Sequence, residues 1–251
     1  MAEFIGKRVI KLNEVDSTNN YAIALCNENS CDEGTIVVAK SQLQGRGQRG
    51  NSWESLSGLN LLCSVILFPE FLPVSHQFLI SKVVALAISD VVADFDIDNC
   101  TVKWPNDVYV GDMKIAGILI ENSIMGNAFR YSVAGIGLNV NQTSFSEKIP
   151  NPVSLTELFG AEIELNTVLN KIILAIDKWY NHLTQANVEF IDATYLSRLY
   201  NFEKLYLFND KNGRFSGRIK GVDEIGRLLI SDTEKHLRTY HFKEVEFVGN
   251  V

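Results

Sequence analysis

The sequence has few cysteines and no excess of positive charge, and each shortage excludes a class of protein. Only four of the 251 residues are cysteines, and their spacing contains no CxxC pair that would hold zinc. The formal net charge of −7 argues against a chain that coats nucleic acid. Any anion that this protein binds must therefore be held by a local group of basic residues.

Long hydrophobic runs and targeting signals are also lacking. Residues 1–15 contain no apolar signal core, and no run reaches the ~18 apolar residues that a membrane helix needs. Hydrophobic residues nevertheless make up 46% of the chain, which is enough to build a substantial core. We therefore expect a globular, cytoplasmic protein with reduced thiols and no contact with a membrane.

Apolar periodicity predicts a fold that mixes helices and strands. Residues 75–95 and 167–183 repeat apolar side chains at helical spacing, and a third helix is expected after the capping residues of the DSTN segment, residues 16–19. Gly111 and Asp112 predict a tight hairpin turn. Strands are predicted within residues 34–40, 59–68, 101–105, 107–110, 114–124 and 126–141.

The pattern changes near residue 200. After Phe202 the chain contains short apolar segments between turns, which is typical of a small β-barrel or sandwich. We expect one domain over residues 1–200 and a second over residues 201–251. The strands of the second domain are predicted within residues 204–208, 214–223, 227–232 and 236–242.

The segment SQLQGRGQRGNSWES, residues 41–55, is the first candidate for ligand binding. Its glycines permit close approach of the backbone and expose N–H groups, and Arg46 and Arg49 add charges that pair with phosphate or carboxylate oxygens. The segment is not a Walker loop, because GxxxxGK[ST] is absent, and no helix follows it as in a dinucleotide fingerprint. A flexible surface loop with incidental arginines accounts for these residues equally well.

The segment KWPNDVYVGDMKIAGILIE, residues 103–121, is the second candidate. Asn106 and Asp107 follow a proline at a strand break, where side chains can point into a cleft, and Asp107 is a candidate Mg²⁺ ligand. Lys114 begins the next strand of the hairpin, so we expect it to reach the same cleft as Asp107. Taken singly, these residues are explained more simply as turn formers and an edge-strand charge.

Two shorter motifs complete the set. The glycines of GIGLN, residues 135–139, indicate a bulge or a close approach of the backbone to a ligand, or simply tight packing. The DSTN segment offers hydroxyl groups at a helix N-terminus, which suits a polar ligand. Helix capping alone also accounts for Ser17 and Thr18.

These four motifs occur in the order found in biotin protein ligases, and the chain resembles that family over essentially its whole length. The resemblance implies an α+β catalytic domain, a mixed sheet with flanking helices like that of class II synthetases, followed by a small SH3-like β-barrel. It also implies that biotin and ATP, with Mg²⁺, form biotinyl-5′-AMP. Biotin would then be transferred to a lysine in the biotin carboxyl carrier domain of a biotin-dependent carboxylase.

The resemblance further implies roles for individual residues. Lys114, Arg46 and Asp107 would be catalytic, with Lys114 binding the biotin carboxylate and the phosphate, and Asp107 lying near the metal. The glycine-rich loop would be a lid over biotin and the adenylate. The biotin-binding set would be Ser17, Thr18, Asn19, Gln42, Arg46, Gly47, Gln48 and Lys114. The ATP- and adenylate-binding set would be Gly45, Arg46, Gly47, Gln48, Arg49, Trp53, Asn106, Asp107, Lys114 and Asn139.

The loop departs from the family pattern at one position. The family usually has GRGRxG there, whereas this chain has Gln48 at the second arginine position. Glutamine still donates a hydrogen bond but carries no charge. We hypothesise that Arg49 compensates in part, or that the adenylate is held less tightly.

Other readings remain beside the ligase. The DSTN motif begins at residue 16, so we expect the ligase-only form without a DNA-binding module. A lipoate–protein ligase or lipoyl transferase shares the fold and the chemistry, although its RRxSGGGxVxH signature is absent. A non-catalytic biotin sensor is a further alternative. The oligomeric state is open, and a homodimer is one of the possibilities.

Overall fold

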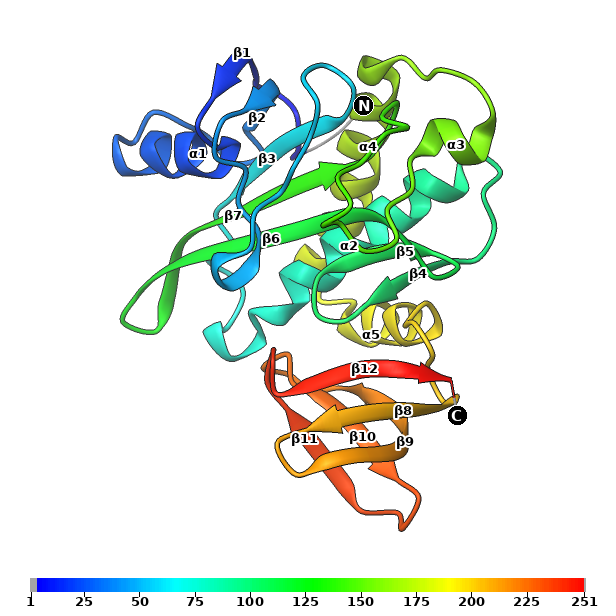
Figure 1. The fold of residues 1–251 in the computed structure, drawn as a ribbon. Helices are drawn as coiled ribbons and strands as arrows, with labels where there is room; N and C mark the ends of the chain where they lie inside the picture. Colours follow the sequence, from blue (N-terminus) through cyan, green and yellow to red (C-terminus); the bar gives the residue numbers. More distant parts are fainter. Residues whose placement is uncertain (1–3, 251) are drawn as a thin grey trace.

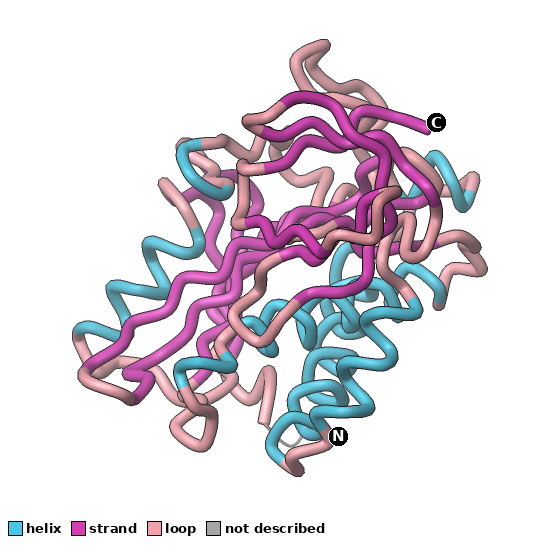
Figure 2. Tube along the Cα trace, turned by 90° about the horizontal axis from the view of Figure 1, so that it is seen from below, coloured by secondary structure: helices cyan, strands magenta, loops and turns pink. Residues whose placement is uncertain are grey.

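The computed structural model describes residues 4–250 and contains two β-sheets, with all of the helices packed around the larger one (Figures 1 and 2). The larger sheet is mixed, with strand order β1-β2-β3-β7-β6-β5-β4, and only β1 and β2 pair in parallel. Its strands are β1 (Val9–Val15), β2 (Ile36–Gln42), β3 (Leu61–Leu67), β4 (Cys100–Lys103), β5 (Asp107–Val110), β6 (Met113–Met125) and β7 (Ala128–Leu138).

The three helices that the sequence predicted are present in the structure. The predicted helices correspond to α1 (Thr18–Asn27), α2 (Phe78–Ala93) and α4 (Leu165–Thr184). The structure adds the short helix α3 (Leu155–Phe159), α5 (Val188–Ser197) and two 3₁₀ turns. It also adds β1, whose sequence VIKLNEV is too polar in its second half to be recognised as a strand.

Strand β3 lies in the interior of the large sheet, between β2 and β7, and is buried on both faces, as its apolar run predicted. Alternate side chains such as Cys63 and Val65 join the core that contains α2 and α4, whereas Ile66 packs with Ala22 and Cys26 of α1. Helix α1 therefore covers one face of the sheet, and α2 and α4 cover the other. Because α1 is short, part of its face is left uncovered.

Helix α2 has the composition of a membrane-spanning helix but is a core helix of this fold. The segment Val74–Ala93 has the length and the mean hydropathy, 1.4, of a membrane helix, but 67% of it is buried inside the fold. The sequence prediction counted only continuous apolar runs and therefore did not single out this segment. Here the apolar residues of α2 pack against α4 and the sheet, as in a core helix.

The second sheet consists of β8 (Leu205–Asp210), β9 (Gly213–Val222), β10 (Leu228–Asp232), β11 (Leu237–Tyr240) and β12 (Val245–Asn250). It is antiparallel, in the order β11-β10-β9-β8-β12. Over the described residues the ladder ends at β11 and β12 and does not close, so the SH3-like barrel stays a prediction. The change from helix to sheet falls between Ser197 and Leu205, close to the expected domain boundary.

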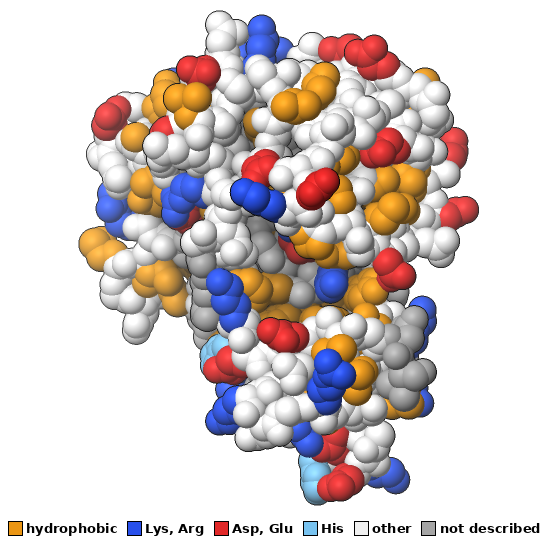
Figure 3. Space-filling model, viewed as in Figure 1, with side chains coloured by type: hydrophobic (Ala, Val, Ile, Leu, Met, Phe, Trp, Pro, Cys, Tyr) orange, Lys and Arg blue, Asp and Glu red, His pale blue; other side chains and the backbone are white. Residues whose placement is uncertain are grey.

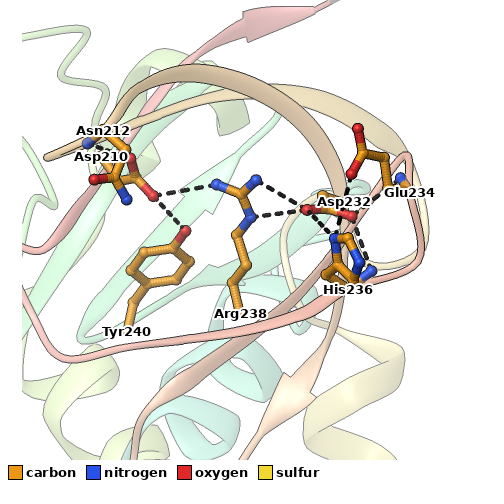
Figure 4. A network of polar contacts seen from close by, with 7 residues as sticks. All are labelled: Asp210, Asn212, Asp232, Glu234, His236, Arg238 and Tyr240. Atoms are coloured by element: carbon orange, nitrogen blue, oxygen red, sulfur yellow. Dashed lines mark hydrogen bonds and ion pairs between the residues drawn. The ribbon is translucent and has the colours of Figure 1, made fainter.

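Arg238 is the centre of a polar network in this sheet (Figure 4). Its guanidinium group donates to Asp232 on one side, at 2.9 Å, and approaches Asp210 on the other, at 3.4 Å. The same group lies 4.1 Å from the ring centre of Phe215, and Tyr240 donates to Asp210. These contacts connect the four strands β8, β9, β10 and β11.

Asp90 of α2 joins helices that support the junction between the two sheets. Its carboxylate accepts hydrogen bonds from Arg198 at 2.6 Å, Trp179 at 2.9 Å and Lys178 at 3.0 Å. Burial raises the pKa of Asp90, but the three donors outweigh that effect and hold the pKa below its usual 3.8. Folding therefore favours the charged form of this carboxylate.

We expect Asp90→Asn to lower the free energy of unfolding by about 1–3 kcal/mol at neutral pH. A lowered folded pKa stabilises the fold above the unfolded value, and that contribution is lost as the pH falls through the folded pKa. Urea denaturation of parent and variant should therefore diverge at pH 7 and converge in acid. The exposed Asp98→Asn is the matched control, and a gap that persists unchanged in acid would contradict the electrostatic explanation.

Candidate functional site

A cavity of about 620 Å³ opens between the uncovered face of the large sheet and the second sheet. Figure 3 shows the hollow between the two parts of the molecule. The walls come from the start of α1, the loop after β2, the β4–β6 hairpins, the middle of β7, and the segment that enters β12. Predicted site residues that line it are Ser17, Thr18, Asn19, Gln42, Arg46, Gly47, Gln48, Trp53, Asn106, Asp107 and Lys114.

Three predicted residues do not reach this cavity or cannot be placed in it. Gly45 lines a neighbouring hollow on the outer side of the loop. Asn139 is 4% exposed, and its side-chain amide donates to the Val153 carbonyl at 3.0 Å, so it connects chain segments beneath the site. The side chain of Arg49 lies outside what the structure describes. A direct role for Asn139 would require this internal hydrogen bond to break.

The start of α1 presents hydroxyl groups that helix capping does not use. Ser17 is the N-cap residue, but its side chain makes no capping hydrogen bond. The acceptor for the first turn is Gln42, whose Oε1 receives the Thr18 N–H at 2.7 Å and lies 3.0 Å from the Thr18 hydroxyl. The capping explanation of the DSTN motif is therefore wrong for the side chains, and the Ser17 hydroxyl is available to a ligand.

Lys114 and Asp107 meet across the β5–β6 hairpin. The Gly111–Asp112 turn forms as predicted, with Gly111 at φ +58°, and Lys114 Nζ lies 2.7 Å from Asp107 Oδ1. Both side chains are about one quarter exposed and face the cavity. The expectation that the hairpin brings these two residues into one cleft is confirmed.

Glu121 organises the polar side of the cavity and was not recognised in the sequence. It forms a bidentate pair with Arg46, at 2.7 Å and 3.1 Å, and accepts from the Asn19 amide at 2.8 Å. Asn20 also accepts from Arg46, at 2.7 Å. Glu121 is the last residue of the candidate segment 103–121, and its role becomes visible only through its partners 75 and 102 residues away in the sequence.

Glycines at the floor of the cavity make room for two of its side chains. Gly117 and Gly137 pair directly between β6 and β7, and a Cβ atom at either position would collide with the Trp53 indole. A Cβ atom at Gly135 would collide with the Asn19 amide. The glycines of GIGLN therefore permit close packing of Trp53 and Asn19, which in turn line the cavity.

The glycine-rich loop is folded back on itself above this floor. Gly47 N–H donates to the Asn51 carbonyl at 2.7 Å, and Trp53 N–H donates to the Gly45 carbonyl at 2.9 Å. The prediction that the glycine N–H groups are free for a ligand is therefore wrong for Gly47. Two polar side-chain atoms in the loop, Gln48 Oε1 and Trp53 Nε1, are buried without a partner, which favours a bound polar ligand.

Asp107 does not make a metal site by itself. Among residues 4–250 no group of three or more His, Cys, Asp or Glu side chains could hold a metal ion, and one oxygen of Asp107 already contacts Lys114. Mg²⁺ is commonly held by one or two carboxylates together with substrate phosphates and water. The arrangement therefore fits a Mg²⁺ ion that enters with nucleotide phosphates, with Asp107 as its protein ligand.

The chain is thus an α+β protein with a polar cavity beneath a glycine-rich loop. A model of the biotin/lipoate A/B protein ligase family matches residues 12–141, more than half of the chain. The chain therefore belongs to the biotin/lipoate A/B protein ligase family.

Individual relatives agree with this assignment. The bifunctional ligase/repressor BirA of Bacillus spizizenii is 29% identical over 97% of this chain and 75% of its own length. The biotin–[acetyl-CoA-carboxylase] ligase of Paracoccus denitrificans is 28% identical over 87% of this chain and 92% of its length. The structure of biotin protein ligase from Aquifex aeolicus in complex with biotin and ATP superimposes with a TM-score of 0.81, at 27% identity, covering 98% of this chain and 100% of that one.

Proposed function

We propose that this protein is a biotin–protein ligase that activates biotin with ATP and transfers it to a lysine of an acceptor protein. The observation that carries this proposal is the Lys114–Asp107 pair in the same cavity as the hydroxyl and amide groups of α1. The relatives named for biotin, and the Aquifex complex with biotin and ATP, support biotin and ATP as the substrates.

The first half-reaction joins two anions, so the site must offset their repulsion. A biotin carboxylate oxygen attacks the α-phosphorus of ATP, the bond to the bridging oxygen breaks, and pyrophosphate leaves. Lys114 lines the cavity beside Asp107, and its ammonium group would contact both the carboxylate and the α-phosphate and so lower the cost of bringing them together. Arg46, which is paired with Glu121, would add a second positive charge. Asp107 would hold a Mg²⁺ ion that accompanies ATP, and such an ion would supply further positive charge.

In the second half-reaction the enzyme positions the reactants, and none of its own side chains acts as a nucleophile. The neutral amine of the acceptor lysine attacks the activated carbonyl carbon, AMP leaves as the phosphate anion, and the amine proton is released. The packed loop and the Trp53 indole cover the cavity floor and limit access of water to the acyl-adenylate. Ser17, Thr18, Asn19 and Gln42 would hold the biotin ring system at the α1 end of the cavity.

We propose the biotin carboxyl carrier domain of a biotin-dependent carboxylase as the acceptor, and the cytoplasm as the location, where the four free cysteines would stay reduced. Intact-mass measurement of a purified carrier domain, incubated with the protein, biotin and MgATP, tests the transfer. One added biotin on the carrier lysine is expected. Formation of biotinyl-AMP without any labelled carrier would contradict this choice of acceptor.

The uncharged Gln48 is expected to affect how tightly the protein holds biotinyl-AMP. Because the loop lacks the usual charge at this position, we expect free biotinyl-AMP to escape from the parent about 5- to 10-fold faster than from Gln48→Arg, the loss of a modest charge-assisted contact. Release can be followed by chromatography of the nucleotide in single-turnover reactions without acceptor. Asn51→Arg, which adds the same charge elsewhere in the loop, is the control. Equal release from parent and Gln48→Arg would show that Gln48 holds the adenylate as well as arginine does.

A further inference from the structure

Lys103 lies at the end of β4 in an unusual environment. Its ammonium group faces three aromatic rings, at 4.6 Å from the ring centre of Tyr109, 5.2 Å from Tyr200 and 5.3 Å from Phe247. We call these three rings the aromatic cage. They come from β5, from the segment after α5, and from β12 of the second sheet. Lys103 is half-buried and lines the cavity.

Arg46 and Lys114 each form an ion pair at the cavity, whereas Lys103 forms none that the described residues show. Arg46 pairs with Glu121 and Lys114 pairs with Asp107, both at 2.7 Å. Within residues 4–250, no carboxylate lies within 4.0 Å of the Lys103 ammonium, and no hydrogen bond from it is found. Burial lowers the pKa of Lys103, and the more distant charges of Asp107 and Asp112 offset this effect only in part. A cation held in this way is stabilised when an anionic ligand enters.

The position of Lys103 indicates which part of a ligand it meets. In the large sheet β4 is the edge strand farthest from β1, and α1 packs over β2, β3 and β7. If the biotin rings lie at α1 and the reacting carboxylate at Lys114, the region near Lys103 receives the groups on the far side of the α-phosphate. Of those groups the adenosine is neutral, whereas the β- and γ-phosphates carry most of the negative charge of ATP, so a cation here favours the phosphates.

We propose that Lys103 binds the β- and γ-phosphates of ATP, which leave as pyrophosphate, and that the aromatic cage positions it. This inference rests on the proposed function. Ring faces attract a cation without accepting strong hydrogen bonds, so the three N–H groups of Lys103 stay available to phosphate oxygens. Because Phe247 belongs to β12, the second sheet takes part in aligning the leaving group.

The test uses Lys103→Gln in the full-length chain, with Lys148→Gln, an exposed site outside the cavity, as control. We expect the KM for ATP in pyrophosphate exchange to rise about 10- to 100-fold, as for loss of a charge-assisted hydrogen bond. The dissociation constant for biotin and the transfer of biotin from preformed biotinyl-AMP should not change, because neither involves the polyphosphate. Lys103→Arg, which keeps the charge, should recover part of the ATP affinity. A purely structural role would instead weaken all three measurements together.

A measurement on the unmodified chain separates this inference from the proposed function. Inorganic pyrophosphate, titrated by calorimetry, should bind the parent and protect Lys103 from acetylation by acetic anhydride, as read by peptide mass spectrometry. Protection without any exchange activity would remove the ligase proposal and leave the anion site. Normal biotin-dependent exchange, with no protection of Lys103 and an unchanged KM for ATP in Lys103→Gln, would overturn the inference alone.

Discussion

Replacement of Lys114 by methionine is expected to reduce biotin-dependent ATP–pyrophosphate exchange by about 100- to 1,000-fold, the range found when a preorganised donor to a developing charge is removed. Methionine keeps much of the length and packing of the side chain but removes the charge that offsets carboxylate–phosphate repulsion. It also leaves Asp107 without its partner at 2.7 Å, which adds a negative charge to the cavity. Both changes act in the same direction.

The control for this variant is Lys148→Met, an exposed lysine that does not line the cavity. The free energy of unfolding, measured in urea, should be nearly the same for Lys114→Met and Lys148→Met. The reason is that Lys114 and Asp107 are both partly exposed to water. Substantial exchange by Lys114→Met would mean that another cation, such as Arg46 or the magnesium ion, carries the charge compensation.

Glu121→Gln is expected to raise the KM for biotin about 10- to 100-fold, since misplacement of groups that orient a substrate is costly. Glutamine has the same shape, but it cannot hold Arg46 with two charge-assisted bonds while also accepting from Asn19. Stability should change little, because the Arg46 side chain is 41% exposed and an exposed ion pair contributes only about 0–1 kcal/mol. The role of Glu121 is therefore positional.

The measurements for Glu121 are exchange kinetics over a range of biotin concentrations and urea denaturation. Glu14→Gln, an exposed glutamate on the edge strand β1, is the matched control. An unchanged KM for biotin would show that Arg46 and Asn19 keep their places without Glu121. A large loss of stability would instead assign Glu121 to the fold.

Local signals in the sequence were enough to predict the parts of the site that lie close together along the chain. The Gly111–Asp112 turn fixes a two-residue hairpin, so the meeting of Lys114 and Asp107 followed from the residues between them. Helices α2 and α4 were predicted because their apolar stripes are long. The family resemblance brought the four motifs together, and the family match agrees with it.

Contacts between distant segments could not be predicted in the same way. The glycines of GIGLN indicated either a ligand or tight packing; packing is what the structure shows, but the packed side chains, Trp53 and Asn19, lie more than 80 residues earlier. Asn139 ends its strand facing Val153 because of how the following chain returns over the sheet. Strand β12, which brings Phe247 to the aromatic cage, was missed because it follows the last predicted strand segment, residues 236–242.

The central claim is that this chain adenylates biotin, and ATP–pyrophosphate exchange with the purified full-length protein tests it most directly. Biotin and lipoate are supplied in turn with MgATP and labelled pyrophosphate. Exchange that depends on biotin, and is absent or at least 100-fold slower with lipoate, is the predicted result; that ratio is on the order of the discrimination that a shaped pocket provides. Exchange with lipoate alone would assign the protein to the lipoate branch of the family, and no exchange with either substrate would contradict the account.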